Sequence, residues 1–325
     1  VQMWMFFTTK KWVFWAYGGG FVILTSLWIS VQIDVQINEW FGGFYDLIQK
    51  ALGTPNAITM SEYAGGLISF AKLAALAISI NLATSFLTSH FLFRWRRSMV
   101  DWYHQAYDRA RTIEGASQRV QEDTVRFSRI MESLGTSFIE AIMVLIEFFP
   151  ILLGLSAGIS VLFFGDWKYG LVTGALIWTV GGTLLMVLLA WFLRLVGIEY
   201  DLQKKEAAYR KLLVIAEDDN TIRPKSLDEI FEDVKSIHYK SYFQYIWFSI
   251  GRLAYLQTNV LVGYIFLAPA IVAGVMTLGV MQQILRAFGR VESSMLYLFN
   301  SWPTIIELAS VYARLREFER QIKES

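Results

Sequence analysis

The sequence predicts an all-α integral membrane protein, because its composition is too apolar for a soluble domain and its apolar residues gather in long segments. Of its 325 residues, 55% are hydrophobic and 16% aromatic, and only 18% are charged, against about a quarter in soluble domains. A run of about 20 apolar residues suffices to cross the hydrocarbon of a bilayer. Six segments reach that length, and we expect each to form a membrane helix: residues 13–35, 64–93, 138–164, 169–196, 242–276 and 278–309.

The placement of Lys and Arg predicts the orientation of these helices. Residues 94–126 contain seven Arg and residues 194–240 contain nine Lys or Arg, whereas residues 38–62 contain one Lys. Cytoplasmic connections of membrane proteins carry an excess of Lys and Arg. We therefore expect a single transmembrane domain over residues 1–325, with both termini and two long excursions, 94–126 and 197–240, in the cytoplasm.

The same composition argues against several other functions. The net charge is +1, so no basic surface predicts nucleic-acid binding. The sequence contains no Cys, which excludes disulfides, thiolate metal sites and cysteine nucleophiles. The three imidazoles, of His90, His104 and His238, are far apart in the sequence. We expect no metal, no cofactor and no enzymatic activity.

The two excursions follow the second and fourth predicted helices, which is the pattern of the type 1 transmembrane domain of ABC exporters. A domain of that kind works as a dimer, so we expect a domain-swapped homodimer of two six-helix halves. An ABC transporter also needs a P-loop, G-x-x-x-x-G-K-[ST], and no Gly–Lys dipeptide occurs here. We expect either that an ATPase is a separate chain or that another energy source drives transport.

Six short motifs occur in order along the chain: FYDLIQ (44–49), FRWR (93–96), IEGASQRVQEDT (113–124), EAAYRK (206–211), EDD (217–219) and NSW (300–302). Together they resemble the SbmA/BacA family of bacterial peptide-antibiotic transporters. The resemblance implies a homodimeric, multi-pass importer of the bacterial inner membrane, driven by the proton gradient. Its implied partners are protons, the lipid bilayer and peptides, including microcins and proline-rich antimicrobial peptides. Family members carry a further N-terminal membrane helix, for which this sequence begins too late.

Acidic residues recur along the third predicted helix and its approach. Glu122 and Glu147 lie about 37 Å apart at 1.5 Å per residue, which exceeds the hydrocarbon thickness of about 30 Å. Glu132 and Glu140 lie between them. Carboxylates in a low-dielectric cavity exchange protons nearer to neutral pH than carboxylates in water. We expect these four residues to form a stepped path for protons.

The resemblance assigns proton coupling to the acidic positions that match family motifs, namely Glu122, Glu132, Glu206, Glu217 and Asp218, with Arg119 beside them. Glu140 and Glu147 are included for their depth, where an ionised carboxylate is costly. We expect them to be neutral, to face a cavity or to pair with one of three arginines, Arg252, Arg286 or Arg290.

Two alternatives stay open for these acids. Residues 119–126 have the spacing of a solvated helix with internal ion pairs. Glu206, Glu217 and Asp218 could serve only as hydrogen-bonding groups between cytoplasmic helix ends.

A cavity for cationic peptides should be acidic and aromatic, because carboxylates attract cations and aromatic faces bind them. Tyr45 and Asp46 fall at the expected outer mouth, near Asp34, and Tyr297 and Trp302 fall on the last helix. We expect these residues to contact substrate, although most aromatic residues of such a chain face lipid or other helices.

Overall fold

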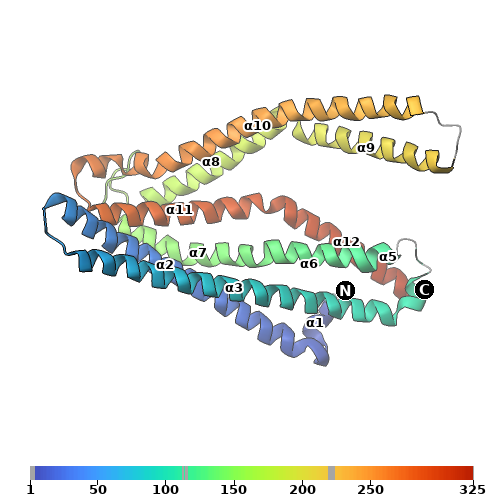
Figure 1. Cartoon of the computed structure of the whole chain (residues 1–325), viewed down its shortest axis with the longest axis horizontal. Coiled ribbons are helices and arrows are strands. Elements are labelled where there is room, and N and C mark those ends of the chain that lie inside the picture. Colours follow the sequence, from blue (N-terminus) through green and yellow to red (C-terminus); the bar gives the residue numbers. More distant parts are fainter. Residues whose placement is uncertain (1–3, 112, 114–115, 219–223, 325) are drawn as a thin grey trace. The chain divides into compact units, whose positions relative to one another are not determined.

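The computed structural model describes residues 4–111, 113, 116–218 and 224–324. These residues fold into helices, with one isolated β-bridge between Val161 and Gly165, so the all-α prediction holds for the described part. The chain forms two compact units (Figure 1). The first unit comprises residues 1–176 and 266–325, and the second comprises residues 177–265.

The first unit begins with a helical hairpin. The short helix α1 (Met5–Thr8) packs on the two long helices α2 (Lys10–Gly53) and α3 (Met60–Gln105). Thr59 and Glu62 form a capping box that starts α3, with Thr59 Oγ1 accepting from Glu62 N at 3.2 Å. Residues 38–62 lie between the first two predicted spans and were expected to form a connecting loop, but α2 continues through most of them, to Gly53. Residues 38–52 contain no Pro, and their helix packs along α11, described below.

A single helical rod follows, and it contains two π-helical segments. The rod runs from Arg119 to Leu155. It consists of η2 (Arg119–Asp123), α6 (Thr124–Ile130), η3 (Met131–Gly135) and α7 (Thr136–Leu155), preceded by α4 (Tyr107–Ala110) and α5 (Ala116–Gln118). The predicted end at residue 164 was wrong, since the chain leaves the helix after Leu155 and Gly158 adopts a positive φ of 78°, which a glycine tolerates without strain.

Residues 154–158 read GLSAG, which matches the G-x-S-x-G letters of a hydrolase nucleophile turn. That turn requires a strand before the Ser and a helix after it. Here a helix precedes Ser156, whose buried hydroxyl donates to Leu153 O at 3.4 Å. The local structure is therefore a helix end and not a nucleophile turn.

The last predicted helix is divided in two at Ser301. The parts are α11 (Leu278–Asn300) and α12 (Trp302–Glu324). Helix α11 packs against both α2 and α7, with Ile284, Ala287 and Val291 fully buried. Helix α12 packs on η2 and α6. The prediction of one helix over residues 278–309 was thus wrong at its centre.

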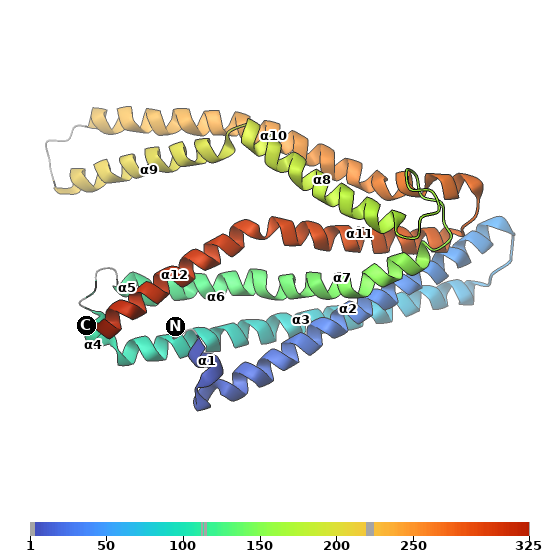
Figure 2. The same cartoon turned by 180° about the vertical axis from the view of Figure 1, so that it is seen from behind.

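The end of the first unit that contains α1 and α12 has its own aromatic core. Buried residues of α1, α3, α6 and α12 meet there, and Figure 2 shows α3, α6 and α12 converging near the C-terminus. Phe6 stacks on Trp95 with ring centroids 5.9 Å apart. Tyr103 is fully buried and donates to Glu319 Oε1 at 3.1 Å. This core fixes α12 beside the segment that carries Glu122.

The second unit is built from α8 (Gly170–Phe192), α9 (Leu195–Asp218) and α10 (Pro224–Ala273). The start of α8 and the end of α10 belong to the first unit. Trp178 stacks on Tyr255 at 5.4 Å and donates its Nε1 hydrogen to Asn259 Oδ1 at 2.7 Å. A Cβ at Gly182 would lie 2.1 Å from the Tyr255 ring, so α8 and α10 approach closely at this glycine.

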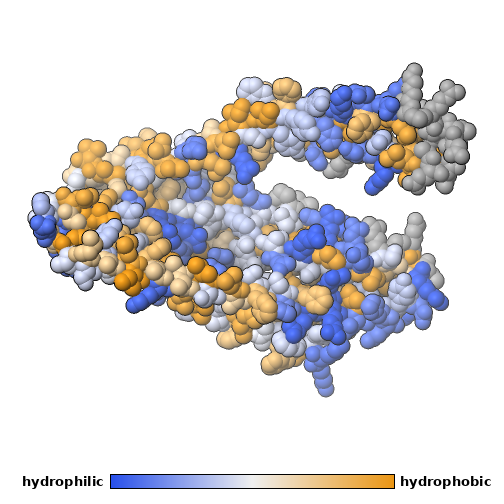
Figure 3. Space-filling view, viewed as in Figure 1, coloured by the Kyte–Doolittle hydropathy of each residue, from blue (hydrophilic) through white to orange (hydrophobic). Residues whose placement is uncertain are grey.

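Among the described residues, five helices are long and apolar enough to cross a membrane: Lys10–Gly53, Met60–Gln105, Arg119–Leu155, Gly170–Phe192 and Leu227–Ala273. Helix α11 is not one of them, because it carries Arg286, Arg290 and Glu292. On the face of the first unit that Figure 3 shows, hydrophobic side chains gather towards the connection of α2 with α3, and hydrophilic ones towards α12. The chain is a multi-pass membrane protein.

Candidate functional site

Helix α2 presents a polar face to α11. Asp34, Asn38, Gly42 and Asp46 recur every four residues, so they lie on one face of the helix. Asn38 is 1% exposed and Gly42 is buried. Polar groups of this kind are costly within an apolar helix unless partners meet them, and α11 supplies those partners.

Two glycines allow α2 and α11 to approach. A Cβ at Gly279 would lie 2.0 Å from the backbone oxygen of Gly42. The Gly279 amide donates to Asp46 Oδ1 at 2.8 Å, and the Leu278 amide donates to Gln49 Oε1 at 2.8 Å. These α2 side chains therefore satisfy the first amides of α11. Asp46, predicted to contact substrate, is engaged here, and its substrate role stays a prediction.

About three turns before Asp46 on α2, Asp34 lies between two arginines. Arg286 Nη2 is 2.5 Å from Asp34 Oδ1, and Arg290 Nε is 2.5 Å from Asp34 Oδ2. Arg290 Nη2 also lies 4.0 Å from Glu140 Oε1 of α7. Asp34, Glu140, Arg286 and Arg290, here called the Asp34 cluster, carry two charges of each sign. This arrangement confirms that Arg290 approaches Glu140, and Asp34 is the partner that sequence reasoning missed.

The Asp34 cluster is incompletely hydrogen-bonded. Among the described residues, Asp34 Oδ2, Arg286 Nε, Arg290 Nε and Asn38 Oδ1 are buried without a hydrogen-bond partner. The Arg290–Asp34 contact is short, but the N–H does not point along it as a hydrogen bond requires. Arg286 also lies over the Phe41 ring at 5.0 Å. Partly satisfied polar groups in a low-dielectric environment are costly, so water or a rearrangement would stabilise this cluster.

A second aspartate, Asp123 in η2, is also held by two arginines. Arg119 Nη1 donates to Asp123 Oδ2 at 2.9 Å, and Arg314 Nη2 of α12 donates to Asp123 Oδ1 at 2.8 Å. Asp123 is 3% exposed. The hydrogen bonds to Asp123 raise the pKa of Arg314 above its ordinary value, although burial opposes the change. These three residues, the Asp123 cluster, are satisfied and tie η2 to α12.

Glu122 and Glu132 both lie in π-helical segments. Glu122 is an exposed residue of η2, and its charge contributes to the raised pKa of Arg314. Glu132 is an exposed residue of η3 and accepts a hydrogen bond from Ser89 Oγ at 2.5 Å. Arg119, expected beside the family acids, donates to the neighbouring Asp123, which is one of the i,i+4 ion pairs that the spacing of residues 119–126 allowed. Single π-turns inside α-helices are rare and occur frequently at functional sites.

The two deeper acids of the rod differ in their surroundings. Glu140 lies within reach of Arg290, as described above. Glu147 is half-buried, and no described cation forms an ion pair with it. Tyr297 of α11 donates to the backbone oxygen of Ser133, inside η3, at 3.4 Å. Tyr45 stacks on Phe41 with ring centroids 5.8 Å apart. The side chain of Trp302 lies outside the described residues.

In the second unit, Glu206 pairs with a histidine. Glu206 Oε1 lies 2.9 Å from His238 Nε2, and both side chains are partly exposed. Lys205 pairs with Asp233 nearby, and both contacts join α9 to α10. The side chains of Glu217 and Asp218 lie outside the described residues. No group of three or more His, Asp or Glu comes together as metal ligands would in the described part of the chain.

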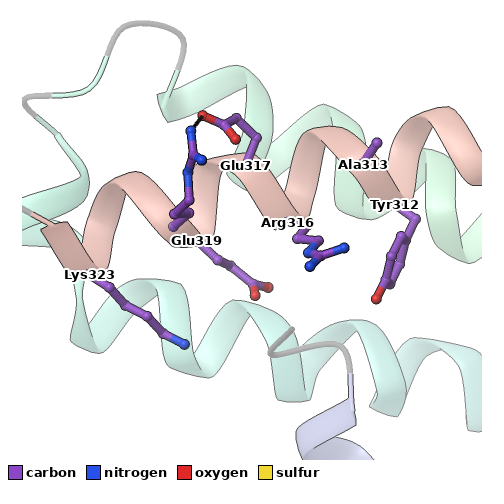
Figure 4. Close-up of a pocket in the computed structure, with 7 residues that line it drawn as sticks. Tyr312, Ala313, Arg316, Glu317, Glu319 and Lys323 are labelled. Atoms are coloured by element: carbon purple, nitrogen blue, oxygen red, sulfur yellow. Dashed lines mark hydrogen bonds and ion pairs between the residues drawn. The ribbon is translucent and has the colours of Figure 1, made fainter.

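The outer face of α12 carries a polar hollow of about 540 Å³. Figure 4 shows the side chains that line it. Arg320 Nη2 lies 2.7 Å from Glu317 Oε1. The lining residues are Tyr312, Ala313, Arg316, Glu317, Glu319, Arg320 and Lys323. Charges of both signs alternate along this exposed helix face, as on solvated helices.

Comparison with known proteins decides the family, because the SbmA/BacA-like family matches residues 9–323. This chain belongs to the SbmA/BacA-like family. An uncharacterized ABC transporter ATP-binding protein of Synechocystis is 28% identical over 243 residues, which cover 71% of this chain and 34% of that protein. An uncharacterized ABC transporter ATP-binding protein of Haemophilus influenzae is 23% identical over 177 residues, covering 46% and 28%. The chain therefore spans about a third of the length of the curated relatives it matches.

Proposed function

We propose that this SbmA/BacA-like protein is a proton-driven importer of peptides, including antimicrobial peptides of the microcin and proline-rich type. It works as a homodimer in the bacterial inner membrane, with six spans in each chain and both termini in the cytoplasm. It performs no covalent chemistry. Family membership and five apolar helices support the transport role. Peptide as substrate and the proton gradient as energy source are parts of the proposal.

One observation carries the proposal: the family acids Glu122 and Glu132 occupy the two π-helical segments of one membrane rod. A π-turn takes one more residue per turn than an α-turn, so it re-aims the side chains around it and can relax back. Acids at such positions can change their surroundings without unfolding the helix. That is what proton coupling requires, because a coupling group must take up a proton in one environment and release it in another.

The deeper acids extend this path. Glu140 shares Arg290 with Asp34, so the charge of Glu140 is coupled to the contact between α2 and α11. When Glu140 carries a proton, Arg290 has one negatively charged neighbour, Asp34, in place of two. Protonation therefore changes the balance of charge in the Asp34 cluster, which offers a route from proton binding to helix movement.

The second candidate is the membrane part of an ABC transporter with an ATPase on a separate chain. The names of both relatives favour it, since those proteins are described as ATP-binding. In this second candidate the acids have structural roles only. Examples are the hydrogen bonds of Glu206 with His238 and of Glu132 with Ser89. The two candidates differ in what drives uptake.

The test uses proteoliposomes that contain the full chain, no nucleotide and an imposed pH gradient, with a fluorescent proline-rich peptide outside. We expect gradient-dependent uptake by the native protein and uptake at background for Glu122→Gln and Glu132→Gln. Glu232→Gln is the matched control, because Glu232 is an exposed acid of α10 that pairs with Lys235. This control should transport as the native protein does.

Uptake that ignores the gradient would overturn the proton-driven importer. Gradient-driven uptake that survives in both Glu→Gln variants would remove these two acids from the mechanism. ATP-dependent uptake that appears only after a cognate ATPase is added would establish the second candidate.

A further inference from the structure

A groove of about 260 Å³ lies between α2 and α3, on the first unit. Its walls are almost wholly apolar or aromatic along most of its length. Phe91 of α3 separates it from a second apolar hollow of about 210 Å³, which is lined from α2 by Gly20, Ile23 and Leu24. The residues of the first groove that matter here are Phe14, Trp15, Gly18, Leu87, Phe91 and Arg94.

Two consecutive glycines of α2, Gly18 and Gly19, line this groove and have different roles. A Cβ at Gly19 would lie 2.9 Å from Phe91 Cδ2, so Gly19 serves the packing of α2 on α3. A Cβ at Gly18 would meet no atom within 4 Å. The missing side chain of Gly18 therefore leaves open space that no packing contact uses.

Cationic side chains lie at one end of the groove. The Arg94 guanidinium lies over the Trp15 ring at 3.7 Å, and the Arg97 guanidinium lies 6.0 Å from the Trp12 ring. Within the described residues neither arginine has a carboxylate partner, whereas Lys11 pairs with Asp101 at 2.7 Å. The groove is thus apolar along its length and positively charged at its end.

Exposed aromatic residues surround the same end. Phe14 is 74% exposed, Tyr17 64% and Trp4 53%. Aromatic side chains gather at the level of lipid headgroups in membrane proteins, and unpaired Lys and Arg gather at the cytoplasmic interface. The groove therefore begins at the headgroup level and extends into the hydrocarbon.

We propose that this groove binds an anionic phospholipid. One acyl chain lies over Gly18 and along Phe91, and the phosphate pairs with Arg94, while the second hollow beside Phe91 offers room for the other chain. The choice of occupant follows from charge complementarity, because a groove with an apolar body and a cationic end matches a lipid that has an apolar tail and an anionic head. None of the four rod acids, Glu122, Glu132, Glu140 and Glu147, lines the first groove, and the proposal does not depend on the proposed substrate.

The test is native mass spectrometry of the full-length protein in detergent, with phosphatidylglycerol or phosphatidylcholine of identical acyl chains added. We expect the native protein to retain phosphatidylglycerol several-fold more than phosphatidylcholine. Gly18→Leu, which fills the groove, should lose both lipids. Arg94→Gln should lose the preference for phosphatidylglycerol, and Arg94→Lys should keep part of it.

Two controls match these variants. Gly181→Leu adds the same side chain to another helix glycine with no atom within 4 Å of its Cβ. Arg129→Gln removes the charge of an exposed arginine of α6. Both should retain phosphatidylglycerol as the native protein does. If Gly18→Leu does not fold, Gly18→Ala and the Arg94 variants test the proposal in its place.

Equal retention of the two lipids by the native protein would overturn the proposal. The proposal would also be overturned if the two control variants lost as much bound phosphatidylglycerol as the groove variants did. Because the chain has no cysteine, Gly18→Cys also reports on a rival occupant. A disulfide-linked dimer of that variant would show that a second copy covers the groove and that lipid does not.

Discussion

The first unit holds two aspartates that are each clamped by two arginines, and they differ in how well they are satisfied. Asp123 has hydrogen bonds from both Arg119 and Arg314. At Asp34, a second acid, Glu140, lies beside one of the two arginines. Among the described residues, Asp34 and both of its arginines also have buried atoms without a hydrogen-bond partner. A satisfied network makes a structure rigid, whereas a partly satisfied one is easier to rearrange. We infer that the Asp123 cluster holds the rod to α12, and that the Asp34 cluster can change with protonation.

The largest expected effect follows from Asp123→Asn. The substitution leaves two arginines facing a neutral amide in a site that is 3% exposed, and removing one partner of a buried ion pair costs about 3–5 kcal/mol. The variant should unfold at a clearly lower temperature in detergent micelles. An unchanged melting temperature would contradict the structural role of this cluster.

Asp34→Asn should have a smaller effect on stability and a larger one on transport. The side chain of Asp34 is 15% exposed, against 5% for Asp123, so water is nearer to the arginines once the acid is neutral, and the loss of a charged hydrogen-bond partner costs about 2 kcal/mol. Thermal unfolding and peptide uptake are measured on the same preparation. If stability falls as far as in Asp123→Asn while uptake is kept, the distinction between the two clusters fails.

Gly279→Ala tests the Asp34 cluster from a distance. The added Cβ would meet the backbone oxygen of Gly42 at 2.0 Å, so α11 must move away from α2. Overpacking of this kind costs about 1–2 kcal/mol. The movement should weaken the contacts of Asp34 with Arg286 and Arg290 but leave the Asp123 cluster intact. Amide hydrogen exchange is measured for α11 and for α12. We expect Gly279→Ala to exchange faster than the native protein in α11 and at the native rate in α12.

The smallest effect is expected from Arg320→Gln on the outer face of α12. The Arg320–Glu317 pair is 2.7 Å long, but its arginine is 64% exposed. Exposed ion pairs contribute below about 0.5 kcal/mol. The melting temperature should stay within error of the native value. A large loss would mean that this helix face is covered by a partner in the protein as purified.

Much of the fold could be predicted from hydrophobic segment lengths, because the bilayer fixes how many apolar residues a span needs. The predicted spans 13–35 and 64–93 lie inside α2 and α3, whereas the predicted span 169–196 is α8 followed by a break at residues 193–194 before α9. Helix ends were predicted less well. Residues 38–53 read as a loop but continue α2, because their partner on α11 lies more than 200 residues away in the sequence.

The candidate site shows the same limit. Glu122 and Glu132 could be chosen from motifs, but nothing in the residue types predicts a π-turn, since it reflects how the rod packs on its neighbours. Asp123 looked like one member of a solvated i, i+4 ion pair, and only α12 brings Arg314 onto it. Asp34 was expected near the outer mouth, and the two arginines of α11 that lie beside it were not predicted as its partners.

Composition and motif order were therefore enough to establish a helical membrane protein of the SbmA/BacA-like family. Both depend on quantities summed along the chain, namely apolar length and residue pattern. Only the packed helices decided which acid meets which arginine, because ion pairs such as Asp34–Arg286 and Asp123–Arg314 join residues that are distant in sequence. Such contacts depend on helix register and close approach at glycines, and neither is encoded in a local segment.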